Sequence, residues 1–234
     1  MGSRSQDAST SRARPSLVPA AICWIAAATV YLVAEAVTAA GFAGYSYAAN
    51  FISDLGVPDV GVMQGRPIDS PRSAVMNAGF IAHGILAAAG AAAAVRARPG
   101  MLGRGFLVLA VLHLLGITAV ALVPGGPHTM EHGLGAVHTV GAGAAICGGN
   151  LATVLAALRL RRSAAPRAPV LVGAGLGVLG LLSAAALVLH MTTDLIPAAP
   201  AGAWERAAVY PIQAAELLAA AVILSRSRRA GHLG

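Results

Sequence analysis

Long apolar stretches alternate with short polar stretches along the chain. Six of them, at residues 17–41, 73–95, 104–123, 133–158, 169–190 and 204–225, are long enough to cross a bilayer, which takes about 20 mostly apolar residues. The pattern predicts an all-α polytopic bundle of six transmembrane helices. We expect this domain to cover residues 16–225, between a disordered N-terminal tail (1–15) and a C-terminal tail (226–234).

The charged residues orient this bundle. All basic residues are arginines, and all except Arg66, Arg72 and Arg206 lie in the two termini or in the segments after the second and fourth apolar stretches. Loops rich in basic residues stay on the cytoplasmic side of a membrane. The sequence therefore predicts cytoplasmic termini and a multi-pass protein of the bacterial cytoplasmic membrane.

Composition narrows the partners. The chain is 57% hydrophobic with a mean hydropathy of +0.73, which a soluble domain of this size does not accommodate. The net charge of +7 is spread over many segment ends, so it does not form the single basic patch that nucleic acid requires. We expect membrane lipids as partners, together with a lipid or small-molecule ligand, and no nucleic acid.

Four ionisable residues are predicted to be buried inside the helices, where each costs several kcal/mol and is a functional candidate by default. They are Glu35, His83, His113 and Glu216. Glu35 and Glu216 should face the bundle interior, where they would suit proton coupling. His83 and His113 both lie near mid-membrane, which leaves a haem as an outside alternative. The sequence does not determine a cofactor.

Two helices carry a polar face. The helix over 133–158 places Thr139, Gly143 and Asn150 at helical spacing, and the helix over 204–225 does so with Gln213 and Glu216. Two interpretations stay open: polar contacts between helices, or a cleft that binds a ligand.

The loop over 43–72 contains Phe51, Ile52 and Leu55 at the spacing of a short amphipathic helix, which Gly56 and Pro58 would end. Such a helix lies on the bilayer surface or forms a lid over a polar site.

A polar cluster is predicted at the external ends of the helices. We expect Asp54, His132, His190, Asp194 and Glu205 to converge on one cleft under the segment 50–56. The catalytic candidates are Asp54, His132, His190 and Asp194, and the last three are weak candidates for metal ligands. Arg206 would bind a lipid phosphate or pair with Asp54 or Asp194. The candidates for ligand binding are Asn50, Asp54, His132, Asn150, Glu205, Arg206, Tyr210 and Gln213.

Several short motifs, in order, resemble a known family. They are the segments 50–56 (NFISDLG), 77–80 (NAGF), 132–136 (HGLGA), 149–150 (GN), 204–206 (WER) and 210–211 (YP). The chain resembles the bacterial and archaeal membrane family called domain of unknown function 998, which implies a multi-pass membrane protein without an assigned activity. Ala214 departs from the pattern, where a bulky aromatic residue is expected beside Tyr210.

Two functions follow from these observations. The first is an integral membrane protein with an outward-facing polar cleft that binds or transports a lipid or small molecule. The alternative is a membrane-embedded enzyme, with or without a metal, that acts on a lipid-like substrate through the external histidines and aspartates.

Overall fold

The structure is a computed structural model that describes residues 15–162, 166–193 and 200–231. Six long apolar helices confirm the predicted spanning segments: α1 (Val18–Ala39), α2 (Ser73–Ala97), α3 (Met101–Leu122), α5 (Gly135–Arg162), α6 (Arg167–Thr192) and α7 (Ala201–Gly231). The shorter elements are the 3-10 helix η1 (Ser53–Gly56), the strands β1 (Val60–Met63) and β2 (Arg66–Asp69), and α4 (Pro127–Glu131). The last helix continues six residues beyond its predicted end at 225.

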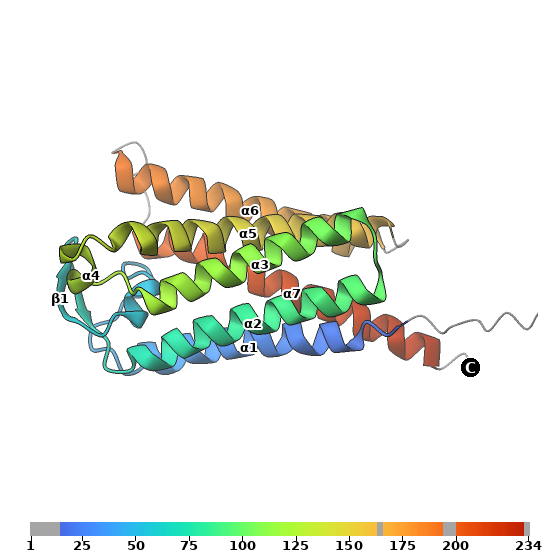
Figure 1. Ribbon diagram of the computed structural model, residues 1–234, viewed down its shortest axis with the longest axis horizontal. Helices are drawn as coiled ribbons and strands as arrows, with labels where there is room; N and C mark the ends of the chain where they lie inside the picture. Colours follow the sequence, from blue (N-terminus) through green and yellow to red (C-terminus); the bar gives the residue numbers. More distant parts are fainter. Residues whose placement is uncertain (1–14, 163–165, 194–199, 232–234) are drawn as a thin grey trace, which may run out of the picture.

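The six long helices form a closed ring in the order α1, α2, α3, α5, α6, α7, with α7 packed against α1 (Figure 1). Helix α1 begins and α7 ends at the same end of the bundle. This end also holds Arg98, Arg159 and Arg162, and we call it the arginine end. The opposite end, which carries η1, the two strands and α4, is the loop end.

The outer surface of the ring suits a bilayer. Large apolar side chains such as Val108, Leu171 and Leu182 are 66%, 70% and 64% exposed. Burying apolar side chains of this size stabilises them by about 1.5–3 kcal/mol each, and lipid provides that environment here. The chain is therefore a multi-pass membrane protein.

The loop end differs from the predicted amphipathic helix. Only Ser53–Gly56 is helical, as one 3-10 turn, and an antiparallel hairpin follows it. Gln64 and Gly65 both have positive φ (49° and 77°), as the two central residues of a type I′ hairpin turn require. The apolar residues of this segment serve burial instead, since Ile52 and Leu55 pack in the core.

The core changes character along the bundle. Toward the loop end it contains large side chains, including Tyr31, Phe42 and Met76. Toward the arginine end, Trp24 and Phe106 pack mainly with alanines, among them Ala91. Because alanine fills little volume, this half of the bundle has room for cavities.

Candidate functional site

The loop end is held together by Arg206, which is only 7% exposed. Its Nη1 donates to the carbonyl oxygens of Tyr47 (2.6 Å), Asn50 (2.8 Å) and Gly202 (3.2 Å). Its Nη2 donates to Glu35 Oε1 at 3.0 Å and to the hydroxyl oxygen of Tyr45. The prediction that Arg206 pairs with Asp54 or Asp194 is therefore wrong for Asp54, and Asp194 lies outside the described residues.

Glu35 is the charged partner of Arg206, and it is 2% exposed. The hydroxyl of Tyr210 donates to both of its carboxylate oxygens, at 2.9 and 3.1 Å. The ion pair and these two hydrogen bonds offset the cost of burying a carboxylate. The hydroxyl of Tyr45 donates to the carbonyl of Phe51 at 3.1 Å. Burial raises the pKa of Tyr45, so this group stays protonated and keeps that bond.

Asp54 is also buried, at 3% exposure, but in a second network. Arg66 binds its carboxylate through two nitrogens, at 3.0 and 3.3 Å, and lies 4.2 Å from the ring centre of Phe51. The side-chain amide of Asn50 donates to Asp54 at 3.2 Å. Asp54 therefore closes the turn of its own loop.

Glu205 joins this loop to α7. Its carboxylate accepts the backbone N–H of Ile52, and the backbone N–H of Ala203 donates to the Ala48 carbonyl at 2.9 Å. The first turns of α7 are thereby fixed to the segment 45–52, which covers the pair formed by Glu35 and Arg206. These contacts favour the second interpretation of the loop, and we call the segment 45–52 the lid.

Of the histidines in the expected cluster, His132 contacts its neighbour His128 on the same loop. His132 is exposed, its Nδ1 lies 2.8 Å from the carbonyl oxygen of His128, and the two imidazole rings stack at 4.2 Å. His190 is half-buried near the end of α6. Of the expected cluster, the structure brings Asp54 and Glu205 to one loop, through Phe51 and Ile52.

A chain of hydrogen bonds crosses the middle of the bundle. Glu216 Oε2 lies 3.2 Å from His83 Nε2, and His83 Nδ1 lies 3.2 Å from His113 Nε2. His113 Nδ1 lies 2.8 Å from the carbonyl oxygen of Ala145. The chain joins α7, α2, α3 and α5. Because His83 and His113 contact each other directly, no iron fits between them in this arrangement.

On the predicted polar faces, Asn150 and Gln213 are buried, whereas Thr139 is exposed and donates to the Gly135 carbonyl. Asn150 donates from Nδ2 to the carbonyls of Ile146 and Ala208, both at 2.9 Å, so it joins α5 to α7. Gln213 is 2% exposed, and neither atom of its amide has a hydrogen-bond partner among the described residues. It lies between Tyr210 and Glu216 on α7, three positions from each, which is the spacing of neighbours on a helix surface.

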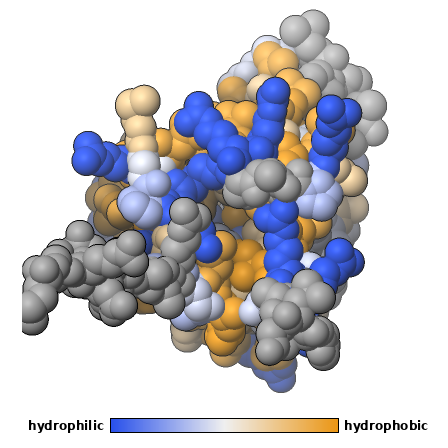
Figure 2. Space-filling view, turned by 90° about the vertical axis from the view of Figure 1, so that its right-hand side faces the viewer, coloured by the Kyte–Doolittle hydropathy of each residue, from blue (hydrophilic) through white to orange (hydrophobic). Residues whose placement is uncertain are grey.

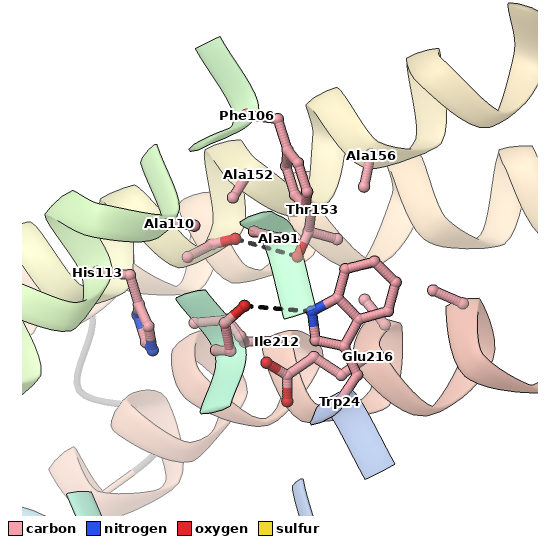
Figure 3. A pocket seen from close by; sticks show the side chains of 14 residues that line it. Trp24, Ala91, Phe106, Ala110, His113, Ala152, Thr153, Ala156, Ile212 and Glu216 are labelled. Atoms are coloured by element: carbon pink, nitrogen blue, oxygen red, sulfur yellow. Dashed lines mark hydrogen bonds between the residues drawn. The ribbon is translucent and has the colours of Figure 1, made fainter. Parts of the chain in front are cut away.

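A small cavity of about 60 Å³ lies beside the mid-membrane chain. Figure 3 shows His113, Glu216, Thr153 and Trp24 around it, from α3, α7, α5 and α1. A cavity of this size with several polar groups has room for a few water molecules.

A larger cleft of about 920 Å³ opens at the arginine end. Its walls are apolar and include Leu218 and Ile223, and its rim includes Arg98, Arg159 and Arg162. Figure 2 views this end and shows hydrophilic side chains around the apolar atoms of the bundle. The cleft and the small cavity adjoin, because both are lined by Trp24, Phe106, Thr153, Ala156, Ala215 and Ala219.

Within the described residues, no group of three or more His, Cys, Asp or Glu side chains is placed to hold a metal ion. Among the weak metal candidates, Asp194 lies outside these residues. The enzyme alternative stays a prediction.

Sequence reasoning missed the cleft at the arginine end. In the sequence, its arginines indicate only the orientation of the bundle, since each lies at a helix end as the charge bias requires. The signal was the preference for alanine over large residues in the same halves of the helices, for example at Ala91 and Ala94.

The comparisons with known proteins agree with the architecture. The model of a family described as "Protein of unknown function (DUF998)" matches residues 25–222. No curated protein and no solved structure matches the chain.

Proposed function

Because the chain belongs to the DUF998 family of unknown function, we propose a function from its own geometry: it binds an anionic lipid-like molecule in the cleft at the arginine end. The apolar chain of the ligand lies among the helices, and its acidic headgroup lies at the arginines. This proposal keeps a lipid ligand but moves its site away from the outward-facing cleft expected from the sequence.

The observation that carries the proposal is the combination of volume, apolar walls and basic rim in one cleft. Its volume of about 920 Å³ lies within the range of small-molecule sites, roughly 300–1,000 Å³. Arginine binds phosphate oxygens through two parallel N–H groups, which gives both affinity and orientation. Lipids with a phosphate diester headgroup match both the apolar walls and the basic rim.

Arg159 is held at the rim by a hydrogen bond and by an aromatic ring. Its Nη2 donates to the carbonyl of Arg98 at 2.8 Å, and its guanidinium lies 5.6 Å from the ring centre of Phe106. These contacts hold the charge where the apolar wall meets the rim. Arg161 lies at the same end but does not line the cleft, so it is a matched control.

Native mass spectrometry of protein released from nanodiscs of phosphatidylglycerol and phosphatidylcholine tests the proposal. Wild type and Arg161→Gln should retain phosphatidylglycerol preferentially, and Arg159→Gln should lose that preference. Equal retention of both lipids by wild type, or equal losses in the two variants, would contradict the proposal.

The shape of the cleft is tested separately from its charge. Ala219 lines both cavities, whereas Ala221 is exposed on the surface of α7. Ala219→Trp should reduce lipid retention because the indole fills the cleft, and Ala221→Trp should not. Identical behaviour of the two tryptophan variants would exclude the cleft as the site.

Transport is the wider form of this proposal. The cleft is open at the arginine end, while the contacts of Arg206 with Tyr47 and Asn50 close the loop end. Movement of a lipid across the membrane requires that closure to open. A disulfide between Ala48→Cys and Ala203→Cys should stop the transfer of fluorescent phosphatidylglycerol in proteoliposomes without stopping its binding. Unchanged transfer after cross-linking would contradict transport by this route.

A further inference from the structure

In the hydrogen-bond chain in the middle of the bundle, the Ala145 carbonyl at one end determines which groups donate and which accept. A carbonyl oxygen only accepts hydrogen bonds, so His113 must carry its proton on Nδ1 to donate to Ala145. The neutral imidazole then has a lone pair on Nε2. His83 must therefore donate from Nδ1 to His113.

The direction of the chain determines which proton can lie in the hydrogen bond between His83 and Glu216. If His83 is neutral, its Nε2 carries a lone pair and Glu216 must be the protonated donor. If His83 carries both protons, Glu216 is a carboxylate that accepts. In either arrangement the pair holds one proton more than a neutral His83 beside an ionised Glu216.

We propose that Glu216 and His83 form a binding site for one exchangeable proton, and that His113 couples its release to the contact between α3 and α5. On release, the proton leaves the Glu216 oxygen or His83 Nε2 for a water molecule in the adjoining cavity. The electron pair of the broken O–H or N–H bond stays on the protein, whose net charge falls by one.

The cavity provides the route for this proton. Glu216 lines the small cavity, and that cavity adjoins the cleft that opens at the arginine end. The proton therefore exchanges with the side of the membrane that the charge bias predicts to be cytoplasmic. Gln213, buried one helical turn further toward the loop end on the same face of α7, separates this site from the ion pair of Glu35 and Arg206.

Proton release changes the chain beyond the pair itself. A neutral His83 that donates from Nε2 to the Glu216 carboxylate has a lone pair on Nδ1, which then faces the lone pair on His113 Nε2. His113 relieves this repulsion by moving its proton to Nε2, and it thereby loses its bond to Ala145. That bond joins α3 to α5, so the protonation state is linked to helix packing.

The groups that face the pair of His83 on α2 and Glu216 on α7 come from α1, α3 and α5. Tyr31 on α1 packs its ring edge-on against His83, with centroids 5.2 Å apart, and His113 on α3 faces His83 at 5.1 Å. From α5 the facing group is the Ala145 carbonyl. Among the described residues, the ionisable groups in or against the hydrogen-bond chain are therefore Tyr31, His83, His113 and Glu216.

Nitrogen NMR of histidine-labelled protein in nanodiscs tests the proposal, because the chemical shifts identify which ring nitrogen carries a proton. In wild type, His113 should be protonated on Nδ1 at low pH and switch to Nε2 as the pH rises. In Glu216→Gln, the amide N–H donates to His83 permanently, so His113 should stay protonated on Nδ1 throughout. Glu131→Gln, which changes an exposed carboxylate, should retain the wild-type switch.

A His113 tautomer that does not change with pH in wild type would overturn the proposal, as would an unchanged switch in Glu216→Gln. If the glutamine variant does not fold, Glu216→Asp replaces it and should displace the midpoint of the switch, whereas an unmoved midpoint would refute the assignment. The lipid-binding proposal is independent of these results, since no lipid variable enters the NMR measurement.

Discussion

At the scale of single residues, the structure depends on buried charges that have several partners each. Arg206 donates to Glu35 and to backbone carbonyls from the loop end, including those of Tyr47 and Asn50. A guanidinium so buried is stabilised only while these acceptors stay in place. The ion pair therefore fixes the lid as well as the contact between α1 and α7.

Replacing one member of this ion pair should leave the other charge uncompensated. We expect Glu35→Gln or Arg206→Gln to lower the free energy of unfolding by roughly 3–5 kcal/mol, measured by thermal unfolding in detergent. The double variant should be less destabilised than the sum of the two, because they share one interaction. Arg72→Gln is the control: Arg72 is exposed and donates to the Val37 carbonyl, so its loss should change stability by about 0.5 kcal/mol or less. If the changes in the free energy of unfolding at Glu35 and Arg206 were additive, the two side chains would not be coupled and the prediction would be wrong.

At the scale of elements, small residues set the distance between helices. A Cβ atom on Gly116 of α3 would lie 2.4 Å from the backbone nitrogen of Ala145 on α5. A Cβ atom on Gly143 would have no neighbour within 4 Å. Close approach at Gly116 also brings His113, one turn earlier on α3, to the carbonyl of Ala145.

The two glycines give a matched pair of substitutions. Gly116→Ala should destabilise the protein by about 1–3 kcal/mol, because the backbone of α5 must move to admit the methyl group. Gly143→Ala should be neutral or stabilising by about 0.5–1 kcal/mol, since alanine favours the helix. Equal melting temperatures for the two variants would contradict the close packing of α3 on α5.

The elements themselves could largely be predicted from the sequence, and their partners could not. Hydropathy predicts the six spans because the length and apolar character of each span depend only on its local sequence. The hairpin was missed because its strands have four residues each and include Gly61 and Pro67, which weaken a strand pattern. The predicted partner of Arg206 was wrong because Glu35 lies 171 residues away in the sequence. Only the packing of α7 against α1 brings Arg206 and Glu35 together.

At the scale of the whole molecule, the two ends of the bundle differ. The loop end is covered by the lid and its ion pairs, whereas the arginine end contains the cleft. A protein that exchanges a ligand with one side of the membrane has this asymmetry. The orientation of the protein in the membrane determines the side from which a ligand enters the cleft.

Cysteine labelling checks that orientation. Val62 on the hairpin and Met101 at the arginine end are 69% and 85% exposed, so neither substitution disturbs packing. With Cys23 and Cys147 replaced by serine, Val62→Cys should react with a membrane-impermeant thiol reagent added to intact cells, and Met101→Cys should react only after lysis. The reverse pattern would invert the topology.

The most direct test of the lipid-binding account is photo-cross-linking with phosphatidylglycerol that carries a diazirine in its acyl chain. The cleft predicts cross-links to wall residues such as Phe106 and Leu218, and a marked decrease of these in Ala219→Trp. Cross-links confined to the outer surface of the ring, such as at Leu182, and unaffected by that substitution would contradict the proposed site.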